Sequence, residues 1–376
     1  MLTWWFLIII VPAIGIMAEY MGKHYSDNGI KYVKYNRCVY FIAIFILIFF
    51  SGLRSITGEG ALSIGDTRIY TGLFQSLVKD SVGEFFSATN FEEDWGFYAL
   101  MSLFKQIFHA DEQGLFFICA FITLGCLFIR YYFFNICDSG LVFFSFITLG
   151  YYVTTMNGVR QWLVSSILFL IFPLVEKKKI VPYFLIVLLV STMHKSALIF
   201  LILYFILDKK PWKIVTKGMI AISLFLLVTY PVTGPYISQV LEDSSYSQYS
   251  DMVLQSGGGS SIFRVLIYVL PVVIAFFYRK NMNKEKHYNM VINCSVLNML
   301  FMLLATTNWI YARMCIYFDP FLIILYIWDI KYAVAPNSKK LAKLLYIVCC
   351  LMYFWYQMYI GYGGQIYTSQ FLGIGV

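Results

Sequence analysis

Long apolar runs recur along the whole chain, and they constrain the fold more than any other feature. Hydrophobic residues make up 60% of the 376 positions and charged residues only 13%. A soluble domain cannot bury that much apolar surface. The clearest runs are residues 3–18, 39–53, 115–129 and 344–358. Each is long enough, with local thinning of the bilayer, to cross a hydrocarbon core of about 30 Å. The sequence therefore predicts an all-α, polytopic membrane protein.

The first apolar run differs from a signal peptide. No basic region precedes it, and no small-x-small cleavage site follows before Glu19. We expect it to remain as the first transmembrane helix. Seven of the eight cysteines lie in or beside apolar runs, so no disulfide framework is predicted.

Lysine clusters predict the orientation, because cationic loops stay in the cytoplasm. A continuous apolar run, 181–207, separates two lysine clusters that should lie on the same side of the membrane. If this run crossed the membrane once, it would place the two clusters on opposite sides. A break at His194-Lys195 resolves this conflict by making two short helices of about 13 residues that fold back as a hairpin. The predicted cytoplasmic clusters are Lys23/Lys31/Lys34, Lys177/Lys178/Lys179, Lys209/Lys210/Lys213, Lys280/Lys284/Lys286 and Lys331/Lys339/Lys340.

With this hairpin the chain makes about 11 to 12 passages, and both termini lie outside. We expect one integral membrane domain, 1–376, in the bacterial cytoplasmic membrane. Its outer surface comprises loop 54–113, loop 233–260, short turns near Thr154 and Thr307, and the tail from Tyr359. The loop 54–113 contains two segments with helical periodicity, 69–77 and 97–108, which we expect to form amphipathic helices at the membrane interface.

The type of cation changes across the predicted membrane. Seventeen lysines and three arginines lie inside, against three lysines and five arginines outside. Lysine suffices for topology, whereas the planar guanidinium suits bidentate binding of phosphate oxygens. Snorkelling anchors at helix ends are the alternative explanation. The outer arginines are Arg54, Arg68, Arg160, Arg264 and Arg313.

Five segments, in order between about residues 50 and 320, resemble the EpsG-like, Wzy-type polysaccharide polymerases. The segments are Gly65-Asp66-Thr67 with Tyr70, Asp94-Trp95-Gly96-Phe97, Asn157-Gly158-Val159-Arg160-Gln161, Met193-His194-Lys195-Ser196 and Ala312-Arg313. Asp94 stands where such proteins usually carry Glu. The resemblance implies transfer of a growing glycan from undecaprenyl diphosphate to the next lipid-linked repeat unit, outside the cytoplasmic membrane. Capsule, exopolysaccharide or O-antigen would be the product.

Such a reaction needs a cationic site for the leaving diphosphate and a base for the acceptor hydroxyl. We assign Arg160 and Arg313 to the diphosphate, supported by Arg54 and Arg264. The candidate bases are Asp66 and His194; a salt bridge or helix cap at Asp66 and a packed histidine at 194 are the structural alternatives. Sugar-binding or supporting roles are expected for Arg68, Asp94, Asn157, Gln161, Lys195, Tyr246 and Tyr249.

The spacing of Asn157, Arg160 and Gln161 at i, i+3 and i+4 predicts that they share one helix face. The sequence predicts no metal, no cofactor and no nucleic-acid partner. The expected partners are the lipid-linked oligosaccharide, membrane lipid, a flippase and a chain-length-regulating co-polymerase.

Other functions would use a similar outer cationic site. A flippase or exporter should carry charges along a path through the bilayer, and mid-helix charges are few apart from Asp319. A glycan ligase or a membrane O-acyltransferase stays possible as an enzyme of another type. A purely structural assembly protein would not explain the change from lysine to arginine.

Overall fold

The computed structural model describes residues 1–27, 30–58, 62–77, 94–109, 111–242 and 259–375. Within them, five helices are long and apolar enough to cross a membrane, two pairs of bent helices qualify together, and five further apolar helices have 10–17 residues. This confirms an all-α polytopic protein. The chain divides into two compact units: unit 1 is Met1–Phe172, Leu185–Ala197 and Asn337–Val376, and unit 2 is Pro173–Phe184 and Leu198–Pro336.

Unit 1 is a helical bundle in which α1 packs against α2 and α7, and α6 packs against α2 and α9. Aromatic rings fill its centre: the ring centroid of Phe143 lies 4.5 Å from that of Phe128 and 5.3 Å from that of Tyr40. The elements are α1 (Leu2–Tyr20), β1 (Lys23–Asp27), β2 (Ile30–Lys34), α2 (Arg37–Gly52), α3 (Thr67–Ser76), α5 (Trp95–Ile107), α6 (Glu112–Phe134), α7 (Ser139–Thr148), α8 (Tyr151–Asn157), α9 (Val159–Ile171), α20 (Lys339–Tyr356) and the π-helical turn Gln357–Gly361.

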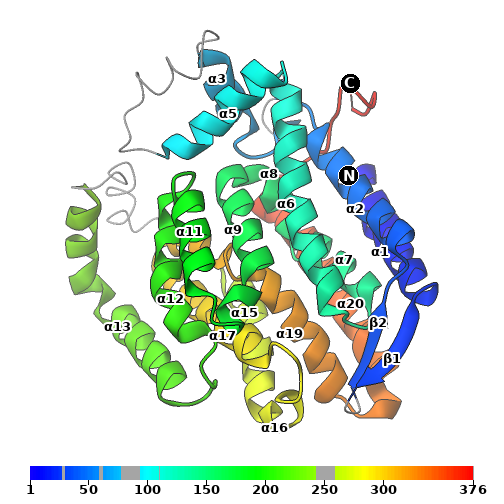
Figure 1. The fold of residues 1–376 in the computed structure, drawn as a ribbon, viewed down its shortest axis with the longest axis vertical. Helices are drawn as coiled ribbons and strands as arrows, with labels where there is room; N and C mark the ends of the chain where they lie inside the picture. The colour runs from blue at the N-terminus through cyan, green and yellow to red at the C-terminus, as the bar shows by residue number, and fades with distance from the viewer. Residues whose placement is uncertain (28–29, 59–61, 78–93, 110, 243–258, 376) are drawn as a thin grey trace. The chain divides into compact units, whose positions relative to one another are not determined.

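The two ends of unit 1 differ in the segments that they carry. Helices α3 and α5 lie at one end and the lysine-bearing β1–β2 hairpin at the other (Figure 1). The tail after α20 returns to the α3–α5 end, where Gln365 donates to the carbonyl of Ser63 at 2.7 Å and the Ser55 amide donates to the carbonyl of Thr368 at 2.8 Å. The indole of Trp4 donates to the carbonyl of Gln365. Both termini therefore lie beside the loop that was predicted to be outside.

The β1–β2 hairpin is a small departure from the predicted all-helical chain. The strands pair antiparallel, with Lys23 opposite Lys34 and Tyr25 opposite Tyr32. Asn28-Gly29 stands between them in the sequence, and this dipeptide favours two-residue hairpin connections. The hairpin still presents Lys31 and Lys34 as exposed residues, as expected of a cytoplasmic turn.

Unit 2 is built around α17, which contacts α12, α13, α15, α18 and α19. Buried Asp319, which the sequence placed mid-helix, is the first residue of α19 and accepts a hydrogen bond from Asn298 of the adjacent helix α17 at 3.0 Å. The elements are α10 (Pro173–Glu176), α12 (Ile199–Leu207), α13 (Ile214–Glu242), α15 (Ile262–Phe277), α16 (Arg279–Met282), α17 (Tyr288–Leu304), the 3-10 turn Trp309–Tyr311, α18 (Ala312–Cys315), α19 (Asp319–Tyr332) and the 3-10 turn Pro336–Ser338.

The predicted hairpin between the two lysine clusters is present. Helix α11 (Ile180–Ser191) ends before His194, and helical structure resumes as the 3-10 turn Lys195–Leu198 and α12. The hydroxyl of Tyr183 donates to the carbonyl of Phe200, and the rings of Tyr183 and Tyr204 lie 5.2 Å apart. Residues on the two sides of the break therefore pack against each other, as the parity argument requires.

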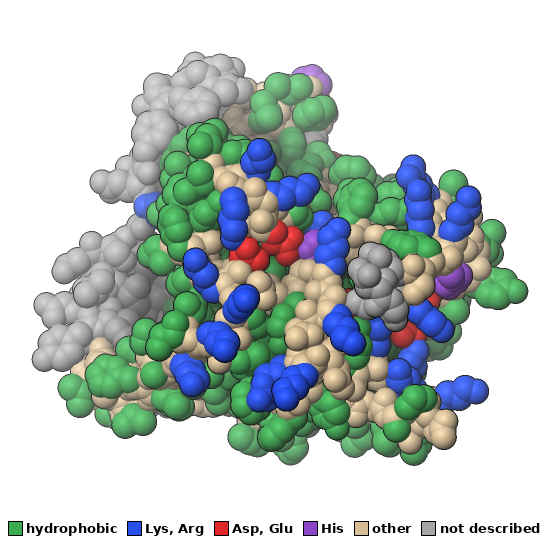
Figure 2. Space-filling view, turned by 60° about the horizontal axis from the view of Figure 1, so that its bottom comes forward, with side chains coloured by type: hydrophobic (Ala, Val, Ile, Leu, Met, Phe, Trp, Pro, Cys, Tyr) green, Lys and Arg blue, Asp and Glu red, His purple; other side chains and the backbone are tan. Residues whose placement is uncertain are grey.

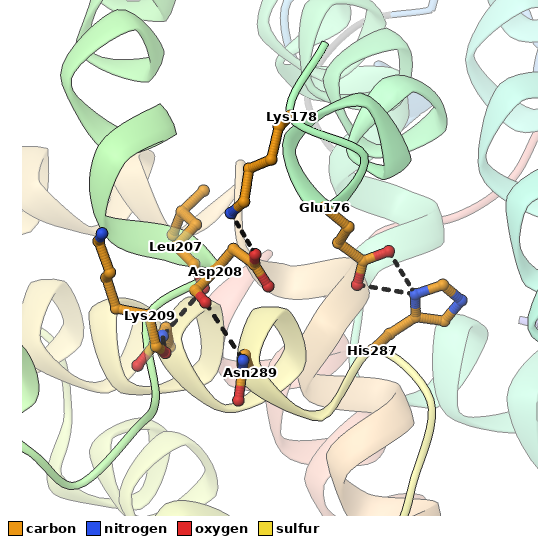
Figure 3. A network of polar contacts seen from close by, with 8 residues as sticks. Glu176, Lys178, Leu207, Asp208, Lys209, His287 and Asn289 are labelled. Atoms are coloured by element: carbon orange, nitrogen blue, oxygen red, sulfur yellow. Dashed lines mark hydrogen bonds and ion pairs between the residues drawn. The ribbon is translucent and has the colours of Figure 1, made fainter. Parts of the chain in front are cut away.

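A polar network joins the base of this hairpin (Figure 3). Lys178 forms an ion pair with Asp208, and the Asn289 amide donates to the Asp208 carbonyl at 3.2 Å. His287 Nδ1 lies 2.6 Å from a carboxylate oxygen of Glu176. Three lysine-rich turns, near residues 178, 209 and 286, thus meet at one place in unit 2. Their convergence supports a common side for all three.

Lysine and arginine side chains gather on the surface viewed in Figure 2, where they surround a few acidic side chains. This view brings the lower part of Figure 1 forward. A surface rich in cations is typical of cytoplasmic turns.

Candidate active site

Helices α3 and α5, in the loop that was predicted to be outside, are held on the bundle by one apolar cluster in unit 1. Tyr70 and Phe74 of α3 and Phe97 of α5 are buried in it against α6 and α9. The periodicity correctly predicted both helices. The buried side of α3 is the Tyr70–Phe74 side, however, whereas Ile69 is 62% exposed. Aromatic burial, rather than the aliphatic stripe, decides which side of α3 packs.

The start of α5 is fastened to the break in the α11–α12 hairpin through a glycine. The Gly96 amide donates to the carbonyl of Thr192 at 2.8 Å. A Cβ at position 96 would lie 2.0 Å from the Thr192 hydroxyl oxygen and 2.9 Å from its carbonyl carbon. Only glycine allows this approach. The contact brings Asp94, two residues earlier, to the hairpin break.

Asp94 is the centre of the site, because three protein groups converge on its carboxylate. Arg160 Nη1 lies 3.1 Å from Oδ2, and His194 Nδ1 lies 3.4 Å from the same oxygen. The backbone N–H of Lys195 donates to Oδ1 at 3.1 Å. The Asp94 and His194 side chains are 15% exposed and that of Arg160 is 25% exposed. All three side chains are therefore partly buried.

Asp94 is an ionised carboxylate at neutral pH. Burial alone would raise the pKa of its carboxyl, but the contacts with His194, Arg160 and the Lys195 amide lower it below its ordinary value of 3.8. Positive charge and hydrogen bonds to the charged form together outweigh the loss of hydration. Asp94 thus holds a fixed negative charge between Arg160 and His194.

Arg160 is held from α3 as well as from Asp94. Its Nε donates to the Tyr70 hydroxyl at 3.3 Å, and its guanidinium carbon lies 5.9 Å from the ring centroids of both Tyr70 and Phe97. Burial raises the pKa of the Tyr70 hydroxyl, although the nearby Arg160 opposes this. Tyr70 therefore stays neutral and presents an acceptor oxygen to the guanidinium. These contacts fix the orientation of the arginine fork.

The turn before α3 contacts the end of α8. The backbone N–H of Asp66 donates to Asn157 Oδ1 at 3.2 Å. Gly65 has a positive φ of 54°, and a Cβ there would lie 2.5 Å from that same oxygen. Asp66 occupies the N-cap position of α3, and its side chain makes no capping hydrogen bond. Asn157 therefore supports the turn that carries Asp66.

The prediction that Asn157, Arg160 and Gln161 share one helix face is wrong. Helix α8 ends at Asn157 and α9 begins at Val159, with Gly158 between them. The break sends Asn157 to the Asp66 turn and Arg160 to Asp94. Gln161 is only 5% exposed. Glycine weakens helix continuity, which the spacing argument did not take into account.

Arg54, predicted as a phosphate ligand, is 2% exposed. Its Nε donates to Thr67 Oγ1 at 2.9 Å and its Nη1 to the Ser51 carbonyl at 2.6 Å, and its guanidinium carbon lies 4.3 Å from the ring centroid of Phe116. Burial lowers the pKa of Arg54 to about 10, so it remains cationic at neutral pH. The contacts favour a supporting role, in which Arg54 joins the end of α2 to the start of α3.

The other predicted residues fall in three places. Arg68 is exposed on α3. Arg264 and Arg313 belong to unit 2, where Arg264 is in the first turn of α15 and Arg313 is exposed in α18, its guanidinium carbon 5.5 Å from the Trp309 ring centroid. Tyr246 and Tyr249 lie outside the described residues.

The structure thus brings six predicted residues together in unit 1, in two groups. Thr192 is a partner that the sequence analysis missed, because it acts through its backbone carbonyl and carries no marked chemistry. The signal that could have found it is Gly96, whose place within a polar motif indicates a close backbone approach. In the described part of the chain, no group of three His, Cys, Asp or Glu residues is placed to hold a metal ion. The six residues are Asp66 and Asn157 in one group and Asp94, Arg160, His194 and Lys195 in the other.

A family model describing the EpsG family matches residues 37–371, which is nearly the whole chain. The chain belongs to the EpsG family. EpsG proteins are Wzy-like polysaccharide polymerases, so a polymerase-like function in a membrane setting follows for this member. Neither a curated protein nor a solved structure gives a match. The matched region includes every motif that converges on Asp94.

Proposed function

We propose that this EpsG-family protein is a glycosyltransferase that joins undecaprenyl-diphosphate-linked oligosaccharide repeat units on the outer side of the bacterial cytoplasmic membrane. The product would be a capsule, an exopolysaccharide or an O-antigen. One observation carries the proposal: Asp94 holds an arginine fork and an imidazole on one carboxylate, at the end of unit 1 that carries the outer loop. A cation for a leaving diphosphate thus lies beside a group that can accept a proton.

The arginine serves the leaving group. As the glycosidic carbon leaves its phosphate oxygen, negative charge grows on the diphosphate, and a pre-oriented guanidinium stabilises that charge. Arg160 is oriented by Tyr70 and Asp94 before any substrate binds. We assign it to the diphosphate. Arg313 and Arg264 belong to unit 2, and their roles stay predictions from the sequence.

The base removes the proton of the acceptor hydroxyl, and Asp66 and His194 are the two candidates. Replacing the true base should lower turnover about 100-fold or more and leave donor binding largely intact. Asp66→Asn and His194→Gln, assayed with saturating donor, therefore identify which residue acts. Wild-type turnover in both variants would remove both residues from this role.

The lipid-linked glycans of a deletion strain test the proposal as a whole. Loss of a polymerase should leave single repeat units attached to the carrier lipid, at the outer side of the membrane. Loss of a flippase would leave such units on the cytoplasmic side, and loss of a ligase would leave finished polymer on the carrier. Either of these two outcomes would refute the proposal. A flippase and a chain-length-regulating co-polymerase are the proposed partners.

A further inference from the structure

The Asp94 carboxylate is fully engaged by groups of the protein itself. Its Oδ2 faces both Arg160 Nη1 and His194 Nδ1, and its Oδ1 accepts the Lys195 N–H. Hydrogen bonds from a guanidinium or a backbone N–H to an ionised carboxylate are stronger than bonds between neutral groups. A carboxylate used in this way is poorly placed to bind a sugar hydroxyl. Its effect must instead pass through its partners.

We propose that Asp94 is a positioning residue for His194, and that His194, not Asp66, accepts the proton of the acceptor hydroxyl. This inference rests on the proposed polymerase function. A carboxylate beside Nδ1 favours the tautomer that is protonated at Nδ1, because that N–H can then donate to it. The lone pair needed by a base is then on Nε2, the other ring nitrogen. Asp94 therefore selects the form of the ring that can accept a proton.

The Asp94–His194 dyad is anchored from two independent segments. Asp94 is placed by the Gly96–Thr192 backbone contact, and His194 is followed directly by the Lys195 amide that binds Asp94. The break between α11 and the turn Lys195–Leu198 leaves His194 outside regular helix. Support of the Asp94–His194 pair from two segments of the chain is the arrangement expected of a pre-organised base.

In the transfer step, one bond to the anomeric carbon forms while another bond to that carbon breaks. The acceptor oxygen forms a bond to the anomeric carbon of the donor glycan, and the bond from that carbon to the phosphate oxygen breaks. The diphosphate leaves with the electron pair and is stabilised by Arg160. The acceptor proton goes to Nε2 of His194, and the resulting imidazolium is stabilised by the ionised carboxylate of Asp94. The proton then passes to solvent.

The test uses the purified full-length protein in proteoliposomes with a lipid-linked repeat unit as both donor and acceptor. We expect His194→Gln to lower kcat about 100-fold or more. Asp94→Asn should lower kcat about 10- to 100-fold and leave the donor KM within about threefold. Asp94→Glu, which keeps the charge, should recover much of the rate.

The double variant Asp94→Asn/His194→Gln separates a positioning role from a general structural one. If Asp94 acts mainly through His194, its loss should cost much less once His194 is gone than it costs in the wild-type background, and only the part that acts through Arg160 should remain. A multiplicative loss would overturn the inference. A matched control is Asp138→Asn, because Asp138 also precedes a helix, α7, and pairs with a lysine, Lys343, far along the chain. This control should keep wild-type turnover.

Two failures are distinguishable in the same assay. A well-folded wild-type protein that does not extend the lipid-linked unit would refute the polymerase function. A wild type that does extend it, together with a fast His194→Gln or a fast Asp94→Asn, would refute only the dyad. A slow Asp66→Asn beside a fast His194→Gln would assign the base to Asp66. Circular dichroism and thermal unfolding of each variant would confirm that slow variants are folded.

Discussion

Replacing Arg160 with lysine should slow polymerisation strongly while the protein still folds. Lysine keeps the positive charge and can keep the contact with Asp94, which Arg160 makes at 3.1 Å. It lacks the planar fork and cannot at the same time contact Tyr70, whose hydroxyl lies 3.3 Å from Nε. The substitution therefore removes orientation and bidentate geometry, not charge.

The structure sets the expected magnitudes. A donor that acts mainly in the transition state contributes about 2 to 4 kcal/mol, which corresponds to roughly 30- to 900-fold in kcat at about 1.36 kcal/mol per factor of ten. The effect on folding is smaller. The Arg160 side chain is 25% exposed and that of Asp94 is 15% exposed, so the ion pair itself contributes about 1 kcal/mol or less. This is small beside a total stability of about 5 to 15 kcal/mol.

The assay is extension of a lipid-linked repeat unit by purified Arg160→Lys protein, with folding followed by thermal unfolding. Arg279→Lys is the matched control. Arg279 also stacks on an aromatic ring, with its guanidinium carbon 4.4 Å from the Phe276 centroid, but it lies in a lysine-rich turn of unit 2. Normal polymer length and rate in Arg160→Lys would refute the assignment of the diphosphate to this fork. Equal losses in both variants would point to a nonspecific effect on packing.

Three further predictions follow from the geometry. Gly96→Ala should destabilise the protein by about 1 to 3 kcal/mol through overpacking and should lower its activity. The control Gly125→Ala should be tolerated, because nothing lies within 4 Å of the added Cβ. Equal melting temperatures of the two variants would refute the close approach of Gly96 to Thr192. In a background without native cysteines, a cysteine at exposed Thr306 should react with a membrane-impermeant maleimide in intact cells, and one at exposed Asn283 should not. The opposite labelling pattern would mean that the predicted inside and outside of unit 2 are exchanged. The lowered pKa of Asp94 means that its contribution to stability is fully present above its unfolded pKa of about 3.9 and is lost as the pH falls through the lower folded pKa. The free energies of unfolding of wild type and Asp94→Asn should therefore differ by a constant amount from pH 5 to 8 and converge in stronger acid. A difference confined to pH 6–7 would contradict this.

Much of the helix arrangement could be predicted from the sequence, because membrane insertion depends on the length of each apolar run and on the charges beside it. The lysine clusters around positions 178 and 209 demanded a common side, and the structure joins them through Lys178 and Asp208. The break at His194 followed from the same parity. Residues of the site were harder to group, because Asp94 is 66 positions from Arg160 and 100 from His194. Spacing along one helix even misled, since the helix ends at Asn157.

The sequence by itself determined that the chain folds in lipid, that it is helical and that a helix breaks at His194, because hydrophobic length and cationic flanks act over a single segment. It also supplied the motifs that mark the family. Only the tertiary structure decided which motif meets which: Gly96 approaches Thr192, Asp94 receives Arg160 and His194, and Arg54 turns inward to Thr67. These pairings depend on close packing of α5 and α9 with the hairpin break. Such packing is a property of three-dimensional fit, to which residues distant in the chain contribute equally.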